Sequence, residues 1–305
     1  IGCATAGAMS SMFKAPVAAI VFAVEIFSLD LVFTSLVPLL LASVAAVITS
    51  YFFRGTDVLF SFELLDAWRV KDIVFYVFLG VATGIASVYF SKMYFLITRF
   101  FAWFSNAYVK IGIAALAIGL MLYLFPPLYG EGYGLINNLL NGNTEAALSG
   151  IQYQIDFNNI WMVIVILLII AVFKAIAMTT TFAAGGVGGI FIPTLFMGSA
   201  LGNAVAKAIN QFGFEVSEAN FTLIGMTGLM AGVLHAPLTA IFLIAEITGG
   251  YDLFVPLMLV ATISFGFTKY FVPNSIYTAE LAKRGELITN DKDKNALMML
   301  NIDRV

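Results

Sequence analysis

The sequence has few charged residues, one cysteine and one histidine. Only 11% of its 305 residues are Asp, Glu, Lys or Arg, whereas a soluble domain carries about 25%. The single Cys3 excludes an internal disulfide and a cysteine-based metal cluster, and the single His235 has no acid or cysteine at ligand spacing. Fifteen basic residues face eighteen acidic ones without a basic block, so we expect no nucleic acid partner. We expect no metal site and no cofactor.

Apolar residues make up 61% of the chain, and the mean hydropathy is +0.98. This composition excludes a cytosolic enzyme and a disordered segment, and it indicates an integral membrane protein. A helix needs about 20 apolar residues to cross the hydrocarbon. Runs close to that length, with one Lys or no charge, cover residues 31–53, 73–91, 111–130, 157–181, 191–210, 221–245 and 253–266. We expect an all-α membrane bundle, with the run 221–245 divided at Gly232 and Pro237.

The connections between these runs differ in charge. The segment 91–111 contains Lys92, Arg99 and Lys110 but no acid, which predicts a cytoplasmic loop. The connections 54–72 and 125–160 are richer in acids and are predicted to lie outside. Residues 280–305 hold five acids and five bases, so we divide the chain into a transmembrane domain, 1–280, and a charged cytoplasmic linker, 281–305.

An internal repeat relates two parts of the chain. Residues 7–26 align with residues 228–247 with eight identities in twenty positions, which include Ala-Pro at 15–16 and 236–237 and a Glu at 25 and 246. Duplicated halves of opposite topology are a transport architecture, in which the site lies where broken helices meet near the midplane. Each Pro suits the first turn of a short helix, near whose far end the Glu follows. A carboxylate in a bundle is costly, so Glu25 and Glu246 have either a functional role or a structural one, as caps of a neighbouring helix.

A glycine-rich loop, 183–190, separates two apolar helices. Four glycines in five residues, 185–189, allow close backbone approach to a ligand, and Pro193 fits the first turn of the helix that follows. The first N–H groups of a helix have no internal partner and carry partial positive charge. A buried helix start of this kind suits an anion. Close helix packing through small residues is the structural alternative.

These motifs together resemble the CLC family of chloride channels and chloride/proton antiporters. The run Gly189-Ile190-Phe191-Ile192-Pro193 is similar to the family's GxFxP anion-binding motif. The segment 228–256 is similar to its later helices, residues 13–25 to the matching part of the first half, and Ser275-Ile276-Tyr277 to the start of its last membrane helix. The resemblance covers most of residues 1–285.

The resemblance implies a site and an assembly. The N–H groups of Ile190 and Phe191, in the motif that Gly189 and Pro193 delimit, and the Tyr277 hydroxyl would coordinate chloride at midmembrane. It also implies an inverted-repeat bundle with broken and re-entrant helices, a homodimer with one pore in each subunit, and no enzymatic activity. Membrane lipid would surround it, and the expected location is a cell membrane, the inner membrane of a bacterium. The linker 281–305 would lead to CBS-type regulatory domains.

The sequence departs from the family pattern in two respects. A GSGIP-type loop and a G(K/R)EGP loop with the gating glutamate do not occur in these 305 residues, and residue 1 is Ile. We therefore expect a truncated chain with a partial first repeat and, alone, an incomplete pore.

Antiporters of the family often have two adjacent glutamates where this chain has Glu25-Ile26. Glu25 remains a possible proton path, but Ile26 favours a passive channel or weakly coupled carrier over a chloride/proton antiporter. A secondary transporter of another anion is a more distant alternative.

Overall fold

The computed structural model describes residues 1–27, 33–55, 60 and 68–284, and all regular structure within these ranges is helical. Residues 285–305 of the predicted linker lie outside the described residues. The helices are α1 (Gly2–Phe13), α2 (Pro16–Phe27), α3 (Phe33–Arg54), η1 (Val70–Asp72), α4 (Ile73–Ala102), α5 (Ala107–Leu124), η2 (Pro126–Leu128), α6 (Tyr133–Leu140), α7 (Thr144–Ala147), α8 (Ile160–Ala183), α9 (Phe191–Gln211), α10 (Glu218–Leu234), α11 (Pro237–Ile247), α12 (Phe254–Phe271) and α13 (Ala279–Arg284).

Five helical segments are long and apolar enough to cross a membrane. They are Leu36–Arg54, Val70–Ala102, Ala107–Leu124, Ile160–Ala183 and Phe254–Phe271. The helices α2, α10 and α11 are apolar but have fewer than 18 residues, so none of them spans about 30 Å of hydrocarbon alone. The prediction of an all-α membrane bundle with broken helices is confirmed.

Two predicted boundaries were wrong. The helix α4 continues for 30 residues to Ala102, so Lys92 and Arg99 lie on the helix and not in a loop. Residues 92–102 contain no glycine or proline, so nothing in this segment disfavours continuation of the helix. Gly232 does not divide its run either, because it packs against Ser87 inside α10. The break falls at His235, which has φ of 57°.

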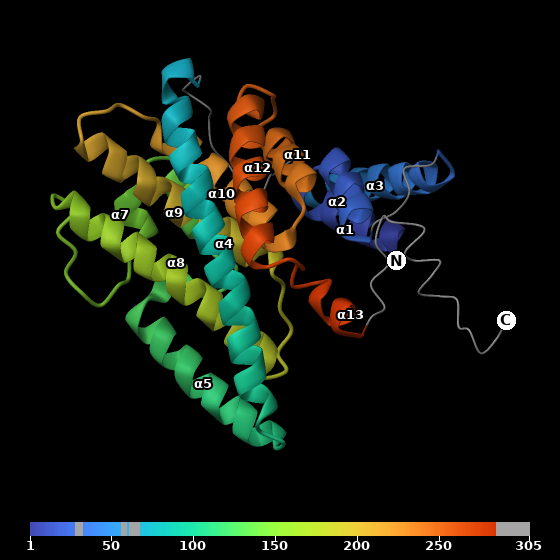
Figure 1. Cartoon of the computed structure of the whole chain (residues 1–305), viewed down its shortest axis with the longest axis horizontal. Helices are drawn as coiled ribbons and strands as arrows, with labels where there is room; N and C mark the ends of the chain where they lie inside the picture. Colours follow the sequence, from blue (N-terminus) through green and yellow to red (C-terminus); the bar gives the residue numbers. More distant parts are fainter. Residues whose placement is uncertain (28–32, 56–59, 61–67, 285–305) are drawn as a thin grey trace.

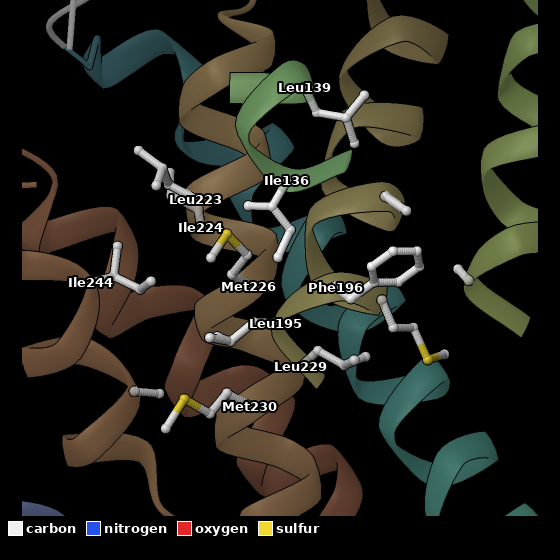
Figure 2. Packing of buried hydrophobic residues seen from close by; sticks show 14 of the residues in the cluster. Ile136, Leu139, Leu195, Phe196, Leu223, Ile224, Met226, Leu229, Met230 and Ile244 are labelled. Carbon is white, nitrogen blue, oxygen red and sulfur yellow. The ribbon is translucent and has the colours of Figure 1, made fainter. Parts of the chain in front are cut away.

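The core is centred on α9 and α10. Every residue of α10 from Asn220 to Leu234 is buried, and α4, α8, α11 and α12 pack around this pair. Figure 2 shows Leu195 and Phe196 of α9 meeting Met226, Leu229 and other side chains of α10, with Ile136 and Leu139 of α6 above them. A helix that is apolar on all sides is buried within a bundle, which fixes α10 at the centre of the second half.

The contact between α9 and α10 is made by backbone against backbone. A Cβ added at Gly202 would lie 2.1 Å from the carbonyl oxygen of Phe221, and one added at Gly225 would lie 2.5 Å from the carbonyl oxygen of Gly198. Small residues that allow such approach are typical of helix pairs in membranes. The crossing therefore sets the position of α9, whose first turn follows the glycine loop.

The structure confirms the repeat. Lys14 at the end of α1 and His235 at the end of α10 both adopt left-handed backbone conformations, with φ of 55° and 57°. Each is followed two residues later by a Pro that begins a short helix, α2 or α11. Figure 1 shows α1, α2 and α3 grouped on one side of the molecule beside α11. The equivalent helices of the second half, α10 and α11, both pack against α12.

Candidate functional site

The glycine loop begins with a tight turn at the end of α8. Gly185 has φ of 98°, a conformation that favours glycine. Its N–H donates to the carbonyl of Phe182 at 3.1 Å, and the N–H of Gly186 donates to the carbonyl of Thr181 at 2.9 Å. A Cβ at Gly186 would lie 2.9 Å from that Thr181 carbonyl oxygen. The sequence therefore ends α8 abruptly and directs the chain toward the start of α9.

The start of α9 has no side-chain cap. The N-cap residue is Ile190, and no side chain of the described residues accepts a hydrogen bond there. Thr194 is the first residue whose N–H is bonded in the turn, to Ile190 O at 3.1 Å. Pro193 has no N–H. The backbone N–H groups that lack a partner in this turn therefore belong to the residues before Pro193. The predicted sequence of loop, uncapped turn and Pro193 is confirmed in backbone geometry, and such a turn suits an anion.

The first turn of α9 adjoins the first half of the repeat. The Phe191 ring lies 5.0 Å from the Phe13 ring of α1 and 5.8 Å from the Phe22 ring of α2, measured between centroids. Phe13 directly precedes the break between α1 and α2 at Lys14. The structure therefore brings the GxFxP segment and the interrupted helices of the first half together, as sites between broken helices require.

Tyr277 lies in the short connection between α12 and α13 and is 39% exposed. Tyr94 of α4 lies near it. The Tyr94 ring lies 6.1 Å from the ring of Phe182, at the end of α8. Among the described residues no hydrogen bond or ring contact joins Tyr277 to Ile190 or Phe191. Its role as an anion ligand therefore stays a prediction.

Glu25 and Glu246 cap each other's helices. The Glu25 carboxylate, on α2, accepts the N–H groups of Leu238 at 3.0 Å and Thr239 at 2.8 Å, and the Thr239 hydroxyl at 2.5 Å. The Glu246 carboxylate, on α11, accepts the N–H groups of Val17 at 3.0 Å and Ala18 at 2.7 Å. Each acid near the end of one short helix thus satisfies donors at the start of the other.

This exchange defines how the two halves are arranged. The carboxylates reach opposite helix starts only if α2 and α11 run antiparallel, which is the geometry of an inverted repeat. The structural alternative for both acids is therefore realised, while a proton path through Glu25 stays a prediction. The sequence analysis did not predict the third donor to Glu25, which is the hydroxyl of Thr239. Thr239 occupies the position equivalent to Ala18 in the repeat. Its hydroxyl, two residues after the helix-starting Pro237, could have indicated an additional hydrogen bond at this helix start.

A buried lysine ties a loop to the same region. Lys174 of α8 is 4% exposed, and its ammonium donates to the carbonyls of Gly130 at 2.8 Å and Leu128 at 3.1 Å. The ammonium also lies 4.4 Å from the centre of the Phe196 ring in α9. These contacts place the loop after α5 against α9, and they replace the water that a buried ammonium loses.

Replacing Lys174 with methionine is expected to lower the free energy of unfolding by about 2 kcal/mol. The variant leaves the carbonyl of the buried Leu128 without its donor, which costs about 1–3 kcal/mol, and it also removes the bond to the carbonyl of the exposed Gly130. The exposed Lys92 of α4 provides a matched control, so Lys92→Met should leave the stability unchanged. Thermal unfolding in detergent measures both variants, and equal unfolding midpoints for wild type and Lys174→Met would contradict the role of the lysine.

No group of three or more His, Cys, Asp or Glu side chains is placed to hold a metal ion in the described ranges. The fold defines a polytopic helical membrane protein built from an inverted repeat. Residues 1–269 match the voltage gated chloride channel family. The chain therefore belongs to that family, the CLC family, whose members are channels and transporters and not enzymes.

Curated relatives match along almost the whole chain. A putative chloride channel protein ClcB-like of Ralstonia nicotianae (strain ATCC BAA-1114 / GMI1000) is 27% identical, over 93% of this chain and 62% of its own length. The voltage-gated ClC-type chloride channel ClcB of Escherichia coli (strain SMS-3-5 / SECEC) is 25% identical, over 93% of this chain and 64% of its own length. The chain thus spans slightly less than two thirds of the length of these relatives.

Solved structures share the fold. A slow cyanobacterial Cl⁻/H⁺ antiporter matches with a TM-score of 0.76 at 22% identity, over 93% of this chain and 64% of the other. A CLC-type fluoride/proton antiporter matches with a TM-score of 0.69 at 23% identity, over 90% and 62%. At these identities the likeness confirms the predicted CLC-type helical fold, and it carries no residue roles to this chain.

Proposed function

We propose that the protein transports chloride, or a similar small anion, across a membrane through a site at the start of α9. The observation that carries the proposal is the uncapped first turn of α9, which directly follows the glycine loop and packs on α1 and α2. Backbone N–H groups attract an anion without the full charge of a lysine or arginine, so they allow release as well as binding. The ligands we propose are the N–H groups of Ile190 and Phe191, within the motif that Gly189 and Pro193 delimit. The Tyr277 hydroxyl is the third proposed ligand.

The mechanism we favour is passive or weakly coupled permeation. Ile26 cannot carry a proton and packs against the hydrophobic core, and Glu25 is occupied by three donors at the start of α11. The curated relatives are called chloride channels. Chloride/proton antiport is the second candidate, since two of the structural neighbours are described as proton-coupled antiporters.

Liposome flux distinguishes these mechanisms. The full-length protein is reconstituted with a chloride gradient, no proton gradient and the voltage clamped by potassium and valinomycin. Chloride flux without proton movement is expected. Chloride flux with uphill proton movement would instead establish antiport, and the absence of any anion flux would contradict the proposal.

A carboxylate introduced beside the first turn of α9 is expected to abolish flux. Gly189 is exposed, and a Cβ there would meet no atom within 4 Å. Asp at this position can occupy the free N–H groups as an N-terminal acid does. Gly189→Asp should therefore lose anion flux, while the uncharged Gly189→Asn and the small Gly189→Ala keep most of it. Equal flux in all three variants would place the anion path elsewhere.

Removing the Tyr277 hydroxyl is expected to weaken anion binding about tenfold. One hydrogen bond to a charged partner contributes about 1.5 kcal/mol or more, and Tyr277→Phe changes little else. Tyr270, which is 83% exposed, supplies the control Tyr270→Phe. The measurement is the anion concentration at half-maximal flux. If Tyr277→Phe retains the wild-type value, Tyr277 is not a ligand.

The assembly and location are further parts of the proposal. We propose a homodimer in a bacterial inner membrane, with membrane lipid as its surroundings and protons as a possible second substrate. The domain division, a transmembrane domain over 1–280 and a cytoplasmic linker over 281–305 toward CBS-type domains, is also proposed. Chemical cross-linking of the protein in native membranes tests the dimer, and a single band at the monomer mass would contradict it.

A further inference from the structure

A cavity of about 630 Å³ lies between the end of α4 and the chain that follows α12. Its walls come from the last two turns of α4, from residues 272–274 and from α13. In Figure 1 the chain after α12 runs toward α13 beside the lower part of α4. Two lining residues, Arg99 and Lys283, are basic and none is acidic, while Phe95, Ala102 and Val272 contribute apolar walls. The cavity thus combines positive charge with apolar surface.

Both basic side chains are available to a ligand. Arg99 has no carboxylate within 4.0 Å in the part of the chain that the structure describes. Lys283 lies 3.7 Å from Glu280, but the two side chains are 67% and 63% exposed, and an exposed pair of this kind contributes little. The Lys283 ammonium also lies 6.0 Å from the centre of the Phe95 ring. The cavity therefore holds two cations beside an aromatic wall, with one loosely held acid nearby.

The cavity lies at the membrane surface. The 30 residues of α4 make a helix about 45 Å long, which exceeds the hydrocarbon thickness of about 30 Å. Its end carries the exposed aromatic residues Phe100 and Trp103, as membrane interfaces do. Arg99 on the last turn of α4 and Lys110 on α5 flank this end, and residues 91–111 contain three basic residues and no acid, which predicts the cytoplasmic side.

We propose that this cavity binds an anionic phospholipid of the cytoplasmic leaflet. The phosphate lies between the Arg99 guanidinium and the Lys283 ammonium, and the upper part of one acyl chain lies along Phe95, Ala102 and Val272. Basic pockets beside membrane helices on the cytoplasmic side suit anionic headgroups. A small free anion would leave the apolar walls uncovered, and a zwitterionic lipid would bring its own ammonium group against the two cations. The site is separate from the start of α9 and does not depend on the transport proposal.

Lipid retention tests the proposal. The full-length protein is exchanged into nanodiscs of equal parts phosphatidylglycerol and phosphatidylcholine, released into detergent, and examined by native mass spectrometry for bound lipid. Each basic residue near a membrane surface contributes about fivefold to anionic lipid binding. We expect Arg99→Gln/Lys283→Gln to retain about 30-fold less phosphatidylglycerol than wild type. Lys92→Gln/Lys110→Gln removes the same charge from positions on α4 and α5 that do not line the cavity, so the lipid held in the cavity should be retained as in wild type.

A steric variant separates the cavity from surface charge. Ala282 lines the cavity, and Ala282→Trp fills its apolar part with no change of charge, so it should also lose phosphatidylglycerol. Loss in both double variants, or retention by Ala282→Trp, would overturn the proposal, because either result places the lipid on exposed charge outside the cavity. Displacement of phosphatidylglycerol by millimolar inorganic phosphate would overturn it too, since it would define a site for a free anion. Size-exclusion profiles that match wild type establish that each variant is folded.

Discussion

Replacing Glu25 with alanine is expected to lower the free energy of unfolding by about 4 kcal/mol. The carboxylate accepts two backbone N–H groups and one hydroxyl at the start of α11. Thr239 is buried, whereas Leu238 is 52% exposed on the protein surface. A buried donor left without an acceptor costs about 1–3 kcal/mol, and surrounding lipid supplies no water to the Leu238 N–H. Glu246→Ala should cost less, about 3 kcal/mol, because Glu246 accepts only two N–H groups.

The two losses should not add. Both carboxylates join the same pair of helices, α2 and α11, so the loss of one cap already weakens the contact that the other requires. The double variant is therefore expected to cost less than the sum of the single variants. Thermal unfolding in detergent gives the three values. Glu145→Ala, which removes an exposed acid of α7, serves as the control and should match wild type.

The glutamine variant separates a cap from a proton carrier. Gln at position 25 keeps one acceptor oxygen and presents an amide that donates, so Glu25→Gln should lose part of the stability and part of the flux together. If Glu25→Gln keeps the stability and the chloride flux of wild type but loses proton movement, Glu25 is a proton carrier. That outcome would contradict the view that its main role is to hold α11.

The repeat shows what the sequence can predict. Two Ala-Pro pairs and two acids at equal spacing predict the starts of α2 and α11 and the place of Glu25 and Glu246 near their ends. The same pattern leaves the role of the acids open, because the partner of Glu25 is 214 residues away in the chain. Only the packing of α2 against α11 decides which donors each carboxylate meets.

Helix lengths were harder to predict than helix starts. Charge alone placed Lys92 and Arg99 in a loop, since charged residues are rare within membrane spans. In the structure α4 has 30 residues and is longer than the hydrocarbon is thick, so a charged residue near its end does not require the helix to stop. Gly232 was predicted to divide its run, but in the structure its lack of a side chain allows close packing against Ser87. Glycine alone does not distinguish a break from a contact.

The largest effect of a single substitution is expected at the crossing of α9 and α10. A Cβ at Gly202 would lie 2.1 Å from the carbonyl oxygen of Phe221 and 3.2 Å from the Cα of Gly225. The obstructing atoms belong to the backbone of buried residues of α10, so they cannot turn aside as a flexible side chain can. Overpacking of a core costs about 1–3 kcal/mol where neighbours can adjust. Gly202→Leu should exceed this range and prevent accumulation of folded protein.

The matched controls lie on α5. Gly112 and Gly119 have no atom within 4 Å of an added Cβ, and both are in the interior of a helix, where alanine is favoured over glycine. Gly112→Leu and Gly119→Leu should therefore accumulate and elute as wild type does on size-exclusion chromatography.

Gly202→Ala tests the contact between α9 and α10 with the smallest possible side chain and should already lower the unfolding temperature. Because α9 begins at the proposed anion site, any Gly202→Ala protein that folds should also show reduced anion flux. Wild-type stability and flux in Gly202→Ala would show that the crossing can widen, and that the position of the first turn of α9 does not depend on it.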